Sequence, residues 1–110
     1  PEAEPFLEGK IPFTALCGYN TLPILSMLNQ LHRRGFRVPE DISVVAYGSE
    51  PYFAAQGVPL TAVMAPGKES GARAVEIMDQ YLTGQIPELQ SDMLPIQLKR
   101  QQSVIRLRRP

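Results

Sequence analysis

The chain has 110 residues, of which 44% are hydrophobic and 20% are charged, a composition typical of one soluble domain. Eleven basic and eleven acidic side chains give a formal net charge of zero. This balance argues against a dominant nucleic-acid surface, because binding to phosphates favours a basic excess. The single cysteine, Cys17, excludes an internal disulfide framework. No apolar run approaches the roughly 20 residues that span a bilayer, and no signal peptide is evident, so we expect a cytoplasmic protein.

The first predicted elements are a strand and a helix. Residues 13–17 form a short apolar segment that indicates a buried strand. Asn20 and Thr21 follow, and both are favourable residues for the N-terminal cap of a helix. A broad apolar stripe at helical spacing then runs through residues 22–34, with polar side chains on the other side. Gly35 suits the left-handed position after a helix, so this helix has a clear end.

A second strand is predicted over residues 42–47, after the turn formed by residues 37–41, RVPED. The strand is apolar without strict alternation, and we therefore expect both faces of the sheet to be covered, as in parallel sheets. Strand, helix and strand within about 35 residues make a βαβ unit, whose crossover is normally right-handed. The residues expected to be buried are Leu16, Ile24, Leu28, Leu31, Val44 and Val45.

The remaining segments predict further short elements. Residues 50–59 contain two prolines, a glycine and two aromatic residues, which predicts an irregular loop or a short helix. Residues 60–64 predict a third strand, and residues 69–83 predict a helix that ends at Gly84. One stripe of that helix is apolar and consists of Ala72, Val75, Met78 and Leu82. Two later segments, MLPIQLK and SVIRLR, indicate one or two short strands, and Pro95 places the former at an edge or a bulge. The predicted fold class is α/β, a three-layer lobe with a parallel sheet and flanking helices.

Catalytic and metal-binding motifs are not found in the sequence. His32 is the single histidine and lies on the polar side of a predicted helix, so with one cysteine a zinc site is not expected. The segment AYGSEP lacks the glycines of a G-x-S-x-G nucleophile elbow. The segment APGKES fails as a phosphate-binding loop, because Glu69 stands where serine or threonine must follow the lysine. We therefore predict that the chain is not an enzyme and uses no cofactor or metal.

Small and polar residues follow two of the predicted strands. Gly18-Tyr19-Asn20-Thr21 follows the first strand, and Gly48-Ser49-Glu50 follows the second. In open α/β sheets, ligands bind outside the carboxyl ends of the parallel strands. If the two strands are neighbours, these segments meet in one crevice. The alternative, two ordinary loops, stays open from these residues alone.

The segment FTALCGYNTLPILSMLNQLHRRGFRVPEDISVVAYGSEPYFAAQGVPLTAVMAP resembles the effector-binding domain of the lactose/galactose-repressor (LacI/GalR) family of bacterial transcriptional regulators. Its most specific part is GFRVPEDISVVAY, which PLTAV follows in the expected order. The resemblance runs from about Pro12 to Ser103. It implies one lobe of a two-lobed, periplasmic-binding-protein-like (type I) fold. A sugar, a nucleobase or a similar small effector would be held between the two lobes.

The resemblance also implies a set of effector-binding residues. Asn20 falls on the family's asparagine that hydrogen-bonds the effector, and Tyr47 falls on the aromatic residue of the family's Gly-Phe-Asp-Asp strand end. Thr21, Gly48 and Ser49 replace aspartates of the family pattern, so no carboxylate stands where sugar hydroxyls are commonly bound, and Glu50 is the nearest. The effector-binding residues expected here are Asn20, Tyr47, Gly48, Ser49, Tyr19 and Thr21.

Domain organisation and partners follow from the same resemblance. Residues 1–110 would be the C-terminal part of an effector-binding and dimerisation domain, with the helix-turn-helix and the first lobe outside this sequence. Helix 69–83 would pack on that first lobe. Members of the family dimerise through regions that correspond here to residues 22–34 and 50–59, and Tyr52 and Phe53 in the latter are typical of interfaces. We expect a homodimer that contacts DNA only through the N-terminal domain. A solute-binding protein of a transport system is the alternative interpretation.

Overall fold

The computed structural model describes residues 3–48 and 57–107. The chain divides into two compact units. The first consists of Pro1–Met64 and Leu98–Pro110, and the second consists of Ala65–Gln97. The first unit contains the parallel sheet and the predicted site, whereas the second contains one long helix and the chain that returns from it.

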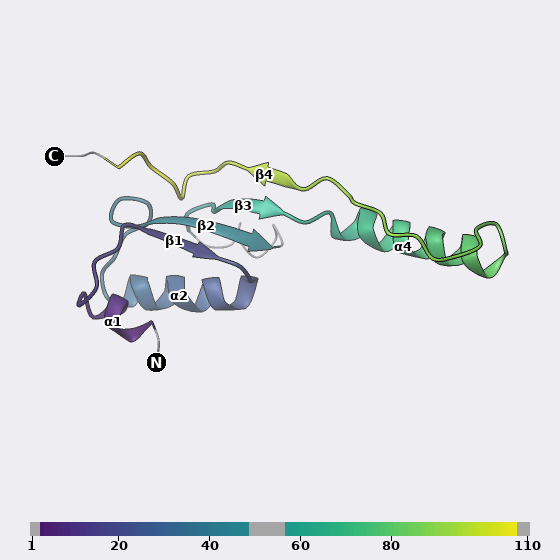
Figure 1. Cartoon of the computed structure of the whole chain (residues 1–110). Coiled ribbons are helices and arrows are strands. Elements are labelled where there is room, and N and C mark those ends of the chain that lie inside the picture. The colour runs from purple at the N-terminus through teal and green to yellow at the C-terminus, as the bar shows by residue number, and fades with distance from the viewer. Residues whose placement is uncertain (1–2, 49–56, 108–110) are drawn as a thin grey trace. The chain divides into compact units, whose positions relative to one another are not determined.

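Within the described residues, four strands form one sheet in the order β1 (Ala15–Gly18), β2 (Ser43–Gly48), β3 (Thr61–Met64) and β4 (Gln97–Lys99). The β1–β2 and β2–β3 pairs are both parallel. The arrow of β4 points the opposite way (Figure 1). The three predicted parallel strands are therefore confirmed, and the chain has the mostly parallel α/β fold that its sequence indicates.

Helix α2 (Thr21–Arg33) lies along one face of this sheet (Figure 1). Its apolar residues recur every three or four positions, so they form one face that packs on the strands. Gly35 has a φ of 84°, the left-handed conformation expected after the helix. Burying each large aliphatic side chain contributes about 1.5–3 kcal/mol. The core of the unit consists of Leu7, Ile24, Leu28, Leu31, Val38, Ile42, Val44, Ala46, Leu60 and Ala62.

The prediction that Leu16 and Val45 are buried is wrong, because both are half-buried. Along β2, burial alternates: Val44 and Ala46 face α2 and are buried, whereas Val45 and its neighbours on the opposite face are half-buried. Within the first unit, α2 packs on β1 and β2 from the face that carries Val44 and Ala46. Leu16 lies on edge strand β1, beside a cavity of about 330 Å³ that keeps it partly open.

A short N-terminal helix, α1 (Glu4–Leu7), was not predicted. Leu7 is buried in the core, and Glu4 accepts a hydrogen bond of 2.8 Å from Arg34 at the end of α2. Phe6 packs edge-to-face on Phe13, with ring centroids 5.8 Å apart. A single helical turn is too short to show a periodic apolar pattern in the sequence. Contacts with residues distant in sequence stabilise it.

Of the two segments predicted to form one or two short strands, MLPIQLK contains β4, and residues 103–107 of SVIRLR are not a strand. The latter segment instead bridges β2 and β3 at their amino ends, through the fully buried Ser103. The Val44 N–H donates to the Ser103 carbonyl at 2.8 Å, and the Ser103 hydroxyl donates to the Val44 carbonyl. The Thr61 N–H donates to Ser103 Oγ at 2.8 Å. The β2–β3 register begins at Val45 and Thr61, so Ser103 supplies backbone partners just before the strands pair.

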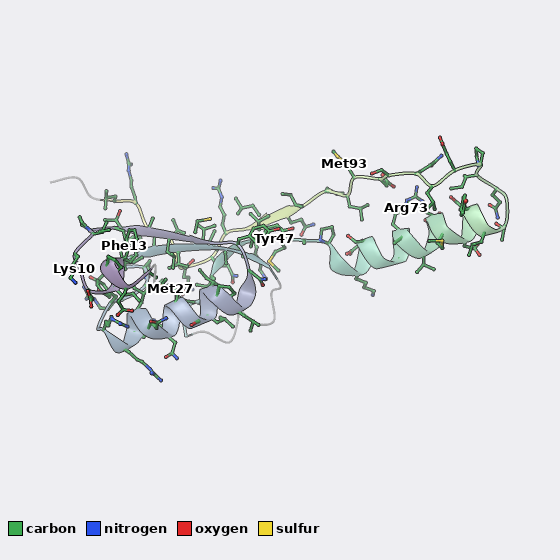
Figure 2. The ribbon with its side chains drawn as sticks, turned by 60° about the horizontal axis from the view of Figure 1, so that its bottom comes forward. Lys10, Phe13, Met27, Tyr47, Arg73 and Met93 are labelled. Atoms are coloured by element: carbon green, nitrogen blue, oxygen red, sulfur yellow. The ribbon has the colours of Figure 1, made fainter. Side chains whose placement is uncertain are left out.

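The second unit is built on α4 (Gly67–Leu82), which begins two residues earlier and ends one residue earlier than predicted. No residue of this helix is buried, and its predicted apolar stripe is exposed: Val75 is 71% and Leu82 74% accessible. Arg73 pairs with Asp92 of the returning chain at 2.7 Å (Figure 2 shows Arg73 on the side of α4 that faces this segment). Arg73 also pairs with Glu76 at 2.8 Å, so one guanidinium joins the helix to its return segment.

The turn before β2 is closed by one carboxylate. Asp41 Oδ2 accepts hydrogen bonds from the Arg37 backbone N–H at 2.8 Å and from Arg37 Nε at 2.9 Å. Asp41 Oδ1 accepts a third from Arg37 at 2.9 Å. These hydrogen bonds, helped by the positive charge of Arg37, lower the pKa of Asp41 to about 2.

Replacing Ser103 by alanine should lower the free energy of unfolding of the first unit by about 1–3 kcal/mol, because it leaves a buried N–H without its acceptor. Urea denaturation followed by circular dichroism would measure the change. Ser26→Ala, at an exposed position of α2, is the matched control and should not lower stability. Equal denaturation midpoints for the two variants would show that the Ser103 bridge is dispensable.

The Arg37–Asp41 pair should make stability depend on pH in the acidic range. Its folded-state pKa lies below the ordinary 3.8, so the pair stabilises the fold above that pH and loses this effect as the pH falls towards about 2. Carbon-detected NMR titration of the Asp41 carboxyl should show the low pKa, and Arg37→Leu should move it up towards 3.8. Arg33→Leu removes an arginine that does not contribute to the shift, and should leave the Asp41 pKa unchanged.

Candidate functional site

The ends of β1 and β2 lie at the same edge of the sheet. The parallel register places Gly18 beside Ala46, and Tyr47 beside Val63 on the next strand. Tyr19 and the residues after it leave the sheet next to the end of β2. Figure 2 shows Tyr47 at this edge, with Phe13 at the other end of the first unit.

The turn from β1 into α2 depends on a glycine at position 18. A Cβ built on Gly18 would lie 2.2 Å from Ile24 Cδ1 and 2.8 Å from Ile24 Cβ, distances that non-bonded carbon atoms do not adopt. Ile24 is 1% exposed, so it has no room to move aside. The first turn of α2 can therefore pack directly on the end of β1, which fixes where the next two residues, Tyr19 and Asn20, leave the sheet.

Asn20 occupies the N-cap position of α2 in an extended conformation, with φ −132° and ψ 150°. Its carbonyl accepts a hydrogen bond of 3.2 Å from the Ile24 N–H. Its side chain makes no capping hydrogen bond and is exposed. The helix start thus uses the backbone of Asn20 and leaves its side-chain amide at the edge of the sheet. Thr21 is the first residue of the helix.

Tyr19 and Tyr47 form a stacked aromatic pair. Their ring centroids lie 5.3 Å apart and their planes differ by 3°. Val44 and Ala46 of β2 face α2, so by alternation Tyr47 lies on the opposite face of the sheet. Tyr47 is half-buried, whereas Tyr19 is 82% exposed. The pair therefore presents an open aromatic surface beside the end of the sheet.

Gly48 ends β2 with a φ of 155°, in the range that residues with a side chain rarely adopt. This is the position at which the family pattern has an aspartate, so a carboxylate here would require a strained backbone or a different strand end. Ser49 and Glu50, as well as Tyr52 and Phe53 of the predicted dimer loop, lie outside the described residues. The structure thus brings Tyr19 and Tyr47 into contact and sets Asn20 and Gly48 at the same edge.

Other groups in the described residues offer less chemistry. No set of three or more His, Cys, Asp and Glu side chains could hold a metal ion within those residues. A cavity of about 470 Å³ lies at the opposite, amino ends of β1 and β2, where Thr14, Ser43 and Ile105 line it. The sequence did not predict this cavity, because one of its sides is formed by a C-terminal segment that is distant in sequence from the strands. The stacked tyrosines remain the distinctive feature of the carboxyl edge.

Comparison with known proteins agrees with this fold. Residues 3–104 match the model of a family described as a periplasmic binding protein-like domain. The chain belongs to this family. Its likeness to the C-terminal effector-binding region of LacI/GalR regulators is confirmed by related proteins, and these are regulators, in agreement with the prediction that the chain is not an enzyme.

Three similar proteins illustrate the relationship. The HTH-type transcriptional repressor PurR of Aliivibrio fischeri is 39% identical over 71 residues, which are 64% of this chain and 21% of that protein. A LacI transcriptional regulator from Bacillus cereus has a similar fold, with a TM-score of 0.83 at 22% identity over 93% of this chain and 36% of its own. A transcriptional regulator CelR, in complex with cellobiose, has a TM-score of 0.82 at 26% identity, over 89% of this chain and 30% of its own.

The chain spans about a fifth of the length of the curated repressors it matches. None of the helices in residues 3–48 and 57–107 has the length and hydrophobicity that crossing a membrane requires.

Replacing Gly18 by alanine should lower the free energy of unfolding by about 1–3 kcal/mol, because the new methyl group overlaps Ile24 inside a packed core. Thermal or urea unfolding of the variant would measure the loss. Gly71→Ala is the matched control, since no atom lies within 4 Å of the added carbon and the residue is inside α4. A Gly18→Ala variant as stable as Gly71→Ala would contradict the close packing of α2 on β1.

Proposed function

We propose that the chain is the effector-sensing part of a LacI-type transcriptional regulator. In this proposal a sugar or a related small molecule binds at the carboxyl edge of the sheet, between this lobe and a second one. Binding there controls the affinity of a helix-turn-helix domain for DNA. The observation that carries the proposal is the side chain of Asn20, which is exposed, directly follows Tyr19 in the chain and makes no capping hydrogen bond at its own helix.

Several features support this proposal. The matched proteins are regulators, and one of them is described in complex with cellobiose. The zero net charge of the chain is consistent with DNA contact through a separate domain rather than through this one. Cys17 is a free cysteine, which suits a reducing cytoplasm. A transport protein of the same fold is the alternative, but the regulator names of the relatives favour sensing.

We also propose that the protein acts as a homodimer through the outer face of α2 and the loop of residues 50–59. On that helix Leu22 is 75% exposed, a large apolar side chain that an interface would cover. Most of the loop lies outside the described residues, so the support comes from the helix. A two-fold axis would bring the same face of each copy together.

Replacing Asn20 by alanine should weaken effector binding about three- to tenfold, the loss expected for one hydrogen bond to a neutral group. Because the side chain does not cap α2, the melting temperature should stay unchanged. Isothermal titration calorimetry of the complete gene product, against a panel of sugars and nucleobases selected by thermal shift, would measure the affinity.

Asn29→Ala, an exposed asparagine further along the same helix, is the control and should bind the selected effector as the wild type does. A variant Asn20→Ala that melts at a lower temperature but binds with unchanged affinity would assign the residue a structural role instead.

A further inference from the structure

We propose that the stacked Tyr19–Tyr47 pair positions Asn20 for effector binding. In this proposal the stack holds the turn between β1 and α2 in one conformation, so the amide of Asn20 is oriented before an effector arrives. Tyr47 is then a positioning residue, which acts on binding through Asn20. The inference rests on the proposed function, because it concerns the same edge of the sheet.

The turn is held first from the face of the sheet that carries α2. A Cβ at Gly18 would lie 2.2 Å from Ile24 Cδ1, so the helix packs directly on the end of β1. The Ile24 N–H also donates a hydrogen bond of 3.2 Å to the Asn20 carbonyl. These contacts restrain the backbone before and after Tyr19, but they involve the side chains of neither Tyr19 nor Asn20.

The aromatic stack holds the same turn from the opposite face. By alternation along β2, Tyr47 lies on the face away from α2. The ring centroids of Tyr19 and Tyr47 are 5.3 Å apart, and the ring planes differ by 3°. Tyr19 is 82% exposed, so little else packs on its side chain. The strand that carries Tyr47 pairs with a neighbour on each side, and the stack therefore ties an exposed residue of the turn to the middle of the sheet.

Asn20 is the residue that this restraint affects most. Its backbone is extended, its side chain is exposed, and that side chain makes no capping hydrogen bond at α2. A capping hydrogen bond would order the amide but would also occupy its oxygen. Because Tyr19 directly precedes Asn20, a fixed Tyr19 ring restricts the direction in which the chain enters Asn20. An amide that is oriented in advance loses less conformational entropy when it binds a ligand.

The expected size of the effect follows from the strength of the stack. An aromatic pair typically favours the contacting state about two- to tenfold in an equilibrium constant. Where a ligand binds one conformation of a protein, its apparent affinity falls with the population of that conformation. Loss of the stack should therefore weaken binding by a similar factor. The loss cannot exceed the contribution of Asn20 itself, because the stack acts through that residue.

The test is a double-mutant cycle on the complete gene product. Isothermal titration calorimetry would use whichever of cellobiose, sucrose, adenine and guanine binds the wild type. Tyr47→Leu should weaken binding about two- to tenfold, whereas Tyr47→Phe, which keeps the ring, should bind as the wild type does. In the Asn20→Ala background, Tyr47→Leu should cause no further loss, because the group that it positions is absent.

The matched control is Phe6→Leu. Phe6 packs edge-to-face on Phe13 at the other end of the unit, so this variant also breaks an aromatic contact but leaves the turn intact. Its affinity for the same compound should equal that of the wild type.

A second measurement needs no ligand. NMR relaxation of the Asn20 backbone amide in the ligand-free protein should show larger picosecond-to-nanosecond motion in Tyr47→Leu and in Tyr19→Leu than in the wild type. The amide of Asn29, further along α2, should relax equally in all three proteins. Because Tyr19 is 82% exposed, Tyr19→Leu should fold even where Tyr47→Leu does not.

Additive losses in the cycle would overturn the positioning role, because Tyr47 would then contribute to binding independently of Asn20. Equal impairment of Tyr47→Phe and Tyr47→Leu would also overturn it, since the ring would not be the group that matters. Unchanged relaxation of Asn20 in both leucine variants has the same meaning. If the wild type binds none of the four compounds, the result counts against the proposed sensing function, and the relaxation measurement alone decides whether the stack orders Asn20.

Discussion

The close packing of Ile24 on Gly18 is the contact on which the arrangement of the carboxyl edge depends. Ile24 belongs to the core, at 1% exposure, yet its atoms occupy the space that a Cβ of residue 18 would need. The chain must therefore turn from β1 into α2 without a longer connection. As a result the residues of that turn, Tyr19 and Asn20, are positioned by core packing rather than by a flexible loop, and a site on such a turn can be rigid without hydrogen bonds of its own.

The amino ends of the strands are fixed by a different contact, the hydrogen bonds of Ser103. Ser103 bonds to the backbone of Val44 and Thr61, at the point where β2 and β3 have not yet paired with each other. A segment from near the C-terminus thus closes the amino ends of strands that lie about 40 and 60 residues earlier in the chain. Buried contacts thus fix the carboxyl end of β1, through Ile24, and the amino ends of β2 and β3, through Ser103. At the carboxyl edge, the side chain of Asn20 makes no capping hydrogen bond to α2.

The sequence allowed most of the first unit to be predicted. Apolar periodicity identified three strands and α2, and Gly35 marked the end of that helix within two residues. The burial of Leu16 and Val45 was predicted wrongly, because a short apolar run looks the same whether one face or both faces of a strand are covered. The role of Ser103 could not be predicted, since its partners are set by tertiary structure. For the site, the rule that ligands bind at carboxyl strand ends located the edge. The contact between Tyr19 and Tyr47 could not be predicted, because it depends on the register of β1 on β2.

The two kinds of side chain at that edge have complementary physical roles. An amide such as that of Asn20 forms directional hydrogen bonds, which distinguish the positions of individual hydroxyls or ring nitrogens. A stacked aromatic pair contributes contact area that depends on the shape of the ligand and little on the position of its polar groups. In the segments that follow the two strands, Glu50 is the one charged residue, and the others are neutral. An edge with both kinds of side chain can therefore select a ligand by its shape and by the positions of its polar groups.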